Sequence, residues 1–85
     1  MSETPEARLK RLHMRSMRRG IKEMDIILQS YAERNLGRMD ETALTLYDAL
    51  LLENDQDLYQ WVTGQGDVPE AYASLIDDIA QTFQK

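Results

Sequence analysis

The chain has 85 residues, which suits one small domain, and it has no cysteine, which excludes disulfides, thiolate nucleophiles and cysteine-ligated metal sites. Its single histidine, His13, excludes a metal site built from several histidines. Fifteen acidic against ten basic residues give a net charge of −5, which argues against a dedicated nucleic-acid binder.

The first part of the chain predicts two helices separated by Gly20. The first covers about residues 5–16, because Thr4 followed by proline is typical of a cap and a first helical turn. The second covers about residues 21–35 and ends near Asn35-Leu36-Gly37. The side chains expected to face the core are Leu9, Leu12 and Met17 in the first helix, and Ile21, Met24, Ile27, Leu28 and Tyr31 in the second.

The rest of the chain predicts three more helices. Asp40 caps the third, Asn54 or Asp55 caps a short fourth that ends at Gly64 and Gly66, and Pro69 opens the fifth. The side chains expected to face the core are Ala43, Leu44, Tyr47, Leu50 and Leu51, then Leu58, Trp61 and Val62, then Tyr72, Leu75, Ile76, Ile79, Ala80 and Phe83. Trp61 is either a core anchor between helices or a partly exposed interface anchor.

No segment shows the alternating pattern of a strand. The predicted fold is therefore all-α, a compact five-helix bundle that forms a single domain over residues 1–85.

The charge is distributed unevenly along the chain. Residues 1–38 hold nine of the ten basic groups and are net +4, whereas residues 39–85 are net −9. This asymmetry indicates either an interaction surface or attraction between the two halves of one fold. The N-terminus lacks the apolar segment of a secretory signal, and no apolar run is long enough to span a membrane. We therefore expect a complete, soluble protein of a reducing compartment.

Few residues are arranged for catalysis or metal binding. His13 and Ser16 lie three residues apart on a predicted helix, but no orienting acid or oxyanion hole accompanies them. The acids of the second half do not match the spacing of a calcium loop and are expected to be solvated: Asp55, Asp57, Asp77 and Asp78. We expect no catalytic residue, no metal ligand and no cofactor-binding residue.

The most informative stretch is Met17-Arg18-Arg19-Gly20-Ile21-Lys22-Glu23, and its part from Arg18 to Glu23 is called the glycine corner below. In one interpretation Gly20 caps the second helix, with Glu23 in the first turn, and Arg19 pairs with Glu23. In the other, Arg18, Arg19 and Glu23 project around Gly20, whose missing Cβ permits a positive φ or the close approach of a partner. The second interpretation predicts a binding module.

Four separated motifs carry a family resemblance. They are Arg11-Leu12-x-x-x-Ser16, Arg19-Gly20-x-x-Glu23, Leu44-Thr45-Leu46-Tyr47-Asp48 and Asp55-Gln56-Asp57-Leu58-Tyr59-Gln60-Trp61. In order and spacing, over about residues 8–62, the series resembles the FAD assembly factor family, the SdhE or succinate dehydrogenase assembly factor proteins of bacteria and mitochondria. The last helix agrees mainly in its apolar pattern.

The resemblance implies a five-helix bundle and an assembly factor rather than an enzyme. Such a factor binds the flavoprotein subunit of succinate dehydrogenase or fumarate reductase and promotes its covalent flavinylation with FAD. The implied partner-binding residues are Arg19, Gly20 and Glu23, with Arg18 as a basic neighbour. FAD belongs to the client, whose own histidine attacks the flavin 8α-methyl, and the factor aligns the two groups. The implied location is the bacterial cytoplasm, or the mitochondrial matrix for a eukaryotic source.

Two other classes of function stay open. One is an antitoxin-like or regulatory protein-binding module. The other is a weak nucleic-acid binder that uses the basic cluster of residues 8–22, although this cluster lacks interleaved aromatic residues.

Overall fold

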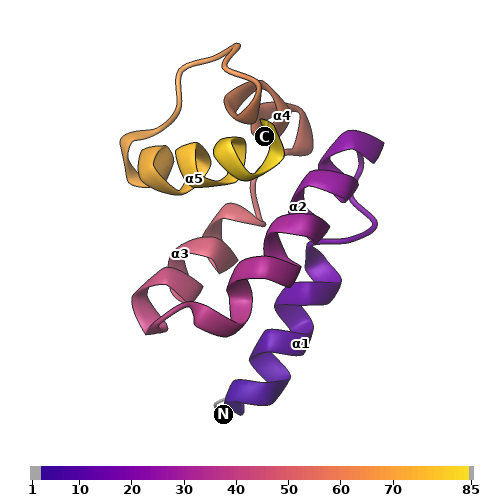
Figure 1. The fold of residues 1–85 in the computed structure, drawn as a ribbon, viewed down its shortest axis with the longest axis vertical. Helices are drawn as coiled ribbons and strands as arrows, with labels where there is room; N and C mark the ends of the chain where they lie inside the picture. The colour runs from indigo at the N-terminus through magenta and orange to yellow at the C-terminus, as the bar shows by residue number, and fades with distance from the viewer. Residues whose placement is uncertain (1–2, 85) are drawn as a thin grey trace.

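The computed structural model describes residues 3–84, which form five α-helices joined by short connections (Figure 1). The helices are α1 (Pro5–Arg15), α2 (Lys22–Asn35), α3 (Glu41–Leu50), α4 (Asp55–Val62) and α5 (Ala73–Gln84), with 3-10 turns at Leu36–Arg38 and Glu70–Tyr72. No strand occurs within residues 3–84. The prediction of an all-α bundle of five helices is confirmed.

Side-chain caps begin three of the helices at the predicted places. Thr4 and Asp40 each accept a hydrogen bond from the N–H three residues on, at 3.1 and 2.8 Å. Of the two candidates for α4, Asn54 is the cap, and its Oδ1 accepts from the N–H two residues on at 2.7 Å. Each bond satisfies a backbone donor that the helix leaves free. Pro69 instead precedes a 3-10 turn, so α5 begins at Ala73, later than predicted.

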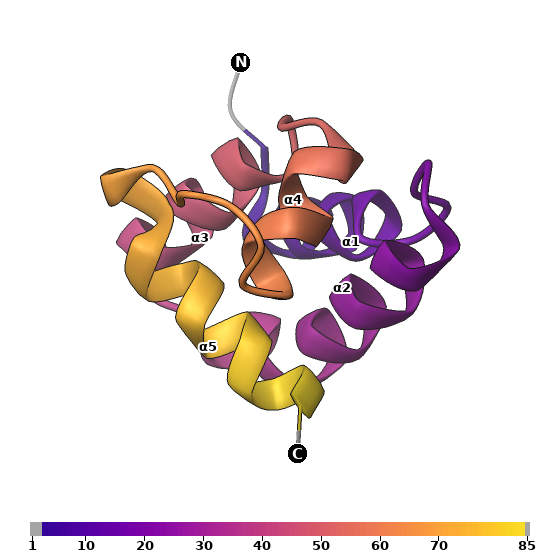
Figure 2. The same cartoon turned by 90° about the horizontal axis from the view of Figure 1, so that it is seen from above.

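The core is centred on α2, which packs against α1, α4 and α5. In Figure 2, α2 and α5 form the arms of a V with α4 between them. The buried apolar side chains are Leu12, Met24, Ile27, Leu28, Tyr31, Ala32, Leu36, Tyr47, Leu50, Leu51, Leu58, Val62, Leu75, Ile76 and Ile79. Most predicted core positions are thus confirmed. In the described part of the chain, no helix has both the length and the apolar character needed to cross a membrane.

Two side chains that were expected to be buried lie at the surface. Met17 is 37% exposed and lies two residues beyond the end of α1, and Phe83 is 47% exposed in the final turn of α5. Both lie at the end of an element, where the helical stripe no longer faces a packed neighbour. Trp61 is partly buried, and its ring lies 6.1 Å from that of Tyr72, just before α5. This position supports the interpretation of Trp61 as an anchor between helices.

Ser16 is fully buried and is therefore not an exposed nucleophile. Its hydroxyl donates to the carbonyl oxygen of Leu12 at 2.7 Å and lies 2.7 Å from the hydroxyl of Tyr47. Because the only hydroxyl proton of Ser16 goes to Leu12, the Tyr47 hydroxyl donates to Ser16. Burial raises the pKa of Tyr47 to about 12, which keeps this phenol protonated. This pair satisfies both polar groups inside the core.

We expect Ser16→Ala to lower the free energy of unfolding by about 1–3 kcal/mol, because the Tyr47 hydroxyl is then buried without a partner. Urea unfolding followed by circular dichroism measures the change. Adding Tyr47→Phe removes the orphaned hydroxyl and should recover part of the loss. If the two single losses simply add, the hydroxyls do not act as a pair.

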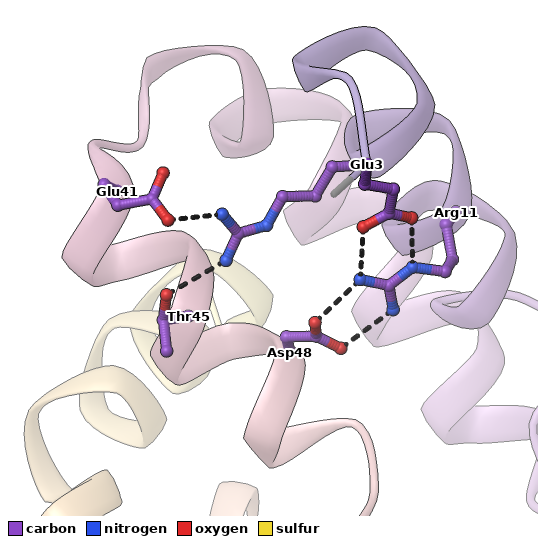
Figure 3. A network of polar contacts seen from close by, with 6 residues as sticks. Glu3, Arg11, Glu41, Thr45 and Asp48 are labelled. Atoms are coloured by element: carbon purple, nitrogen blue, oxygen red, sulfur yellow. Dashed lines mark hydrogen bonds and ion pairs between the residues drawn. The ribbon is translucent and has the colours of Figure 1, made fainter. Parts of the chain in front are cut away.

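Ion pairs join the basic first half of the chain to its acidic second half (Figure 3). Arg8 donates to Glu41 at 2.7 Å, which links α1 to α3. Arg11 donates to Asp48 at 2.8 and 3.0 Å and to Glu3 at 2.6 and 3.0 Å, so one guanidinium holds two carboxylates. These ion pairs support the interpretation in which the two halves attract each other within one fold.

This network predicts a pH dependence, because hydrogen bonding from Arg11 holds the pKa of the Asp48 carboxyl below its usual range. Such a carboxylate stabilises the fold above its unfolded-state pKa, and the contribution is lost as the pH falls through the folded-state pKa. Asp48→Asn should cost about 1 kcal/mol at pH 7, with a difference from wild type that shrinks below about pH 4. Thermal unfolding from pH 7 to pH 2 measures this, with Asp57→Asn as the exposed control. A pH-independent difference would contradict the expectation.

Candidate functional site

The glycine corner connects α1 to α2 at the outer edge of the molecule, away from α5 (Figures 1 and 2). Its backbone is unusual at Arg18, whose φ of 57° lies in the left-handed region. An L-residue in this region costs about 1–2 kcal/mol. Gly20 does not adopt a positive φ. The strained position is therefore Arg18. Glycine is needed at residue 20 because its missing side chain leaves room for a neighbouring group, not because of its backbone conformation.

Asp55, the first residue of α4, closes the corner through both of its carboxylate oxygens. Oδ1 accepts from Arg19 Nε at 2.8 Å, and Oδ2 accepts from the N–H of Gly20 at 2.6 Å. The other nitrogens of Arg19 donate to the carbonyl oxygens of Arg15 at 2.7 Å and Leu51 at 3.1 Å. The side chains of Arg19 and Asp55 are only 10% and 17% exposed. We call this arrangement the Asp55 clasp.

The structure corrects four expectations here. Arg19 does not project from the surface and does not pair with Glu23, because its guanidinium is engaged by Asp55. The N-cap of α2 is Ile21, which makes no side-chain cap bond, so Gly20 is not the cap. Asp55 is not a solvated acid. A Cβ on Gly20 would lie 3.0 Å from Asp55 Oδ2, so the missing side chain makes room for a carboxylate of the same chain.

Sequence reasoning missed this role of Asp55. It considered Asp55 only as a helix cap, as an acid on a helix face, and as part of a family motif. The contact joins residues 36 positions apart, and no local pattern reports such a pairing. The one available signal was indirect: Asn54 satisfies the cap of α4, which leaves the neighbouring carboxylate free for another partner.

Arg18, Lys22 and Glu23 are the exposed charges of the corner. Within residues 3–84, no side-chain hydrogen bond or ion pair involves any of the three, since the ion pairs are those of Arg8, Arg11 and Arg19. Exposed apolar side chains accompany them: Met14 and Met17 before the corner, Ile26 one turn beyond Glu23, and Leu52 next to the carbonyl that holds Arg19. Exposed apolar area beside charges of both signs is typical of a protein–protein interface. The corner is therefore suited to binding another protein.

We expect Glu23→Ala to have little effect on folding, because Glu23 is exposed in the first turn of α2 and makes no cap bond. The loss should be about 0.3–1 kcal/mol, the value of a favourable charge near a helix N-terminus. Urea unfolding measures it, with Glu33→Ala, exposed near the other end of α2, as the control. Severe unfolding of Glu23→Ala would make Glu23 a structural residue rather than one available to a partner.

The remaining polar groups offer little for chemistry or for binding nucleic acid. Among the described residues, no group of three or more His, Cys, Asp or Glu side chains could hold a metal ion. In the basic cluster of residues 8–22, Arg8, Arg11 and Arg19 are already paired with acids of the same chain. The cluster is thus interrupted as a basic surface, which argues against the nucleic-acid alternative.

Comparison with known proteins gives one consistent result. A family model described as the flavinator of succinate dehydrogenase matches residues 10–83. The "Succinate dehydrogenase assembly factor 2, mitochondrial" of Danio rerio is 36% identical over 85 residues, covering 98% of this chain and 54% of that protein. Proteins of the same name from Schizosaccharomyces pombe and Penicillium rubens are 38% and 45% identical, covering 85% and 88% of this chain and 52% and 24% of their own lengths. The chain thus spans at most about half the length of these relatives.

Proposed function

Because the chain belongs to the family of succinate dehydrogenase flavinators, we propose that it binds the flavoprotein subunit of succinate dehydrogenase and promotes covalent attachment of FAD to that subunit. The observation that carries the proposal is the family match over residues 10–83, which includes the whole glycine corner. The relatives are named assembly factors of succinate dehydrogenase, which points the same way. The flavoprotein of fumarate reductase, a similar client, is the second candidate partner.

The proposed mode of action is positioning. In the client, a histidine nitrogen replaces a hydrogen of the flavin 8α-methyl, the electrons of the broken C–H bond reduce the flavin ring, and this chain contributes no atom to the new bond. It holds the client in a conformation in which histidine and flavin are aligned, and such alignment alone accelerates a reaction strongly. The proposed partner-binding residues are Arg18, Arg19, Gly20 and Glu23. FAD stays with the client, and the factor acts where the client folds: the cytoplasm of a bacterium or the mitochondrial matrix of a eukaryote.

A reconstitution tests the proposal. Purified apo-flavoprotein subunit is incubated with FAD, with and without this chain, and the denatured flavoprotein is assayed for flavin fluorescence, which only covalent flavin retains. We expect the chain to accelerate the appearance of covalent flavin on the flavoprotein, and to gain no flavin itself when incubated with FAD alone. Equal rates with and without the chain, or a flavin adduct on the chain, would contradict the proposal.

A further inference from the structure

We propose that Asp55 is a positioning residue of the glycine corner: it holds Arg19 and Gly20 inside the protein and leaves Arg18 as the cation offered to an acidic group of the client. This inference rests on the proposed function, and it gives two neighbouring arginines different roles: Arg19 stabilises the corner and Arg18 contacts the client. It assigns the motif arginine, Arg19, an internal role.

The contacts of Arg19 carry the first part of the inference. Each of its three guanidinium nitrogens already donates a hydrogen bond, to Asp55, to the carbonyl of Arg15 and to the carbonyl of Leu51. Bonds between an ionised donor and an ionised acceptor are among the strongest in proteins. The guanidinium keeps two further N–H donors, but a side chain that is only 10% exposed offers a client carboxylate little access to them. Arg19 therefore joins the end of α1 to the start of α4.

The carboxylate of Asp55 also fixes the backbone of the corner. Its second oxygen holds the N–H of Gly20 at 2.6 Å, and the missing Cβ of Gly20 is what allows this approach. The carboxylate of Asp55 thus holds both the side chain of Arg19 and the backbone of Gly20. Loss of Asp55 would release both together.

Arg18 carries the second part of the inference. Its φ of 57° would suit glycine better, and its exposed side chain has no polar partner within residues 3–84. The side chain therefore adds strain without a visible gain for the fold, which is the pattern of a residue held for binding. Lys22, the other exposed cation of the corner, begins α2 with an ordinary helical backbone, so the strain singles out Arg18 as the cation that matches an acidic group on the client.

The first test concerns the free protein and needs no client. In Asp55→Asn the amide resonance of Gly20 should shift and its hydrogen exchange should become faster, because the charged acceptor is lost. Asp57→Asn, the same change two residues along α4 at an exposed position, is the matched control. An unchanged Gly20 amide in Asp55→Asn would overturn the clasp itself.

The second test measures how fast each variant of this chain associates with the purified apo-flavoprotein subunit and dissociates from it, at several salt concentrations. The temperature is one at which circular dichroism shows that every variant is folded. Arg18→Gln should slow association and flatten its salt dependence, because an exposed charge acts at long range and is screened by salt. Arg18→Lys keeps the charge and should restore the association rate and its salt dependence. Arg18→Gly should restore neither of them, but it should keep or raise the thermal midpoint because glycine suits the positive φ.

Arg19→Gln and Asp55→Asn should behave differently from Arg18→Gln. Each should weaken the complex by about tenfold or more, mainly through faster dissociation, with the salt dependence of wild type. The double variant should bind no more weakly than either single variant, because both changes release the same clasp.

Several outcomes would overturn the inference. A flattened salt dependence in Arg19→Gln, as in Arg18→Gln, would place Arg19 in contact with the client. Additive losses for Arg19→Gln and Asp55→Asn would show that they do not act through one another. Normal binding by Asp55→Asn, with binding lost in Gly20→Arg, would make the clasp purely structural. Normal binding by all variants, Gly20→Arg included, would place the client contact outside the glycine corner and overturn the inference, whereas no binding by the wild-type chain would contradict the proposed function.

Discussion

Gly20→Arg should reduce covalent flavinylation of the client by at least about tenfold while the chain keeps its helices. A Cβ at this position lies 3.0 Å from Asp55 Oδ2, so any side chain presses on the carboxylate that holds the corner together. The longer arginine also fills the space that a partner would use and adds a cation beside Arg18. Because Gly20 has no positive φ, no backbone strain adds to these effects.

The experiment uses cells that lack the wild-type factor and express one variant each. Flavin fluorescence of the denatured flavoprotein reports the covalent fraction, and circular dichroism of the purified variant reports folding. Gly37→Arg is the matched control, because it adds the same side chain at an exposed glycine where a Cβ would meet nothing within 4 Å. Normal flavinylation with a folded Gly20→Arg variant would remove the glycine corner from the mechanism.

The largest loss of stability is expected for Ile79→Ala. Ile79 is fully buried in α5, so its truncation removes apolar contacts and leaves a cavity, at a cost of about 2–5 kcal/mol in the free energy of unfolding. Phe83 lies one turn further along the same predicted stripe but is 47% exposed, so Phe83→Ala should cost only about 1 kcal/mol. Urea unfolding of both variants measures the difference. Equal losses would mean that α5 packs differently at its end.

The helices were predictable because their determinants are local. Thr4, Asp40 and Asn54 cap the helices that follow them, and each forms its bond within three residues of chain. The buried face of α2 follows helical spacing, so its core residues could be read from the sequence. Where a stripe reaches the final turn of a helix, as at Phe83, or runs beyond it, as at Met17, spacing alone predicts burial wrongly.

The organisation of the site was not predictable in the same way. The motif residues Arg19 and Gly20 stand out in the sequence, but their partner Asp55 comes from the start of another helix. Helical spacing predicted that Arg19 pairs with Glu23, four residues away. In the folded chain Arg19 pairs instead with Asp55, which is less exposed. The left-handed backbone at Arg18 has no sequence signal either, because glycine, the residue expected there, stands two positions later.

Promotion of covalent flavin attachment by this chain can be measured in cells deprived of their own factor. The flavoprotein subunit of succinate dehydrogenase is isolated from these cells with and without expression of this chain, denatured, and assayed for flavin fluorescence at equal protein amounts. We expect little covalent flavin without the chain and recovery when it is expressed, in parallel with recovery of succinate oxidation. If covalent flavin is unchanged by a folded, expressed chain that is retained on the flavoprotein, the chain binds the client without flavinylating it, and the proposed function is wrong.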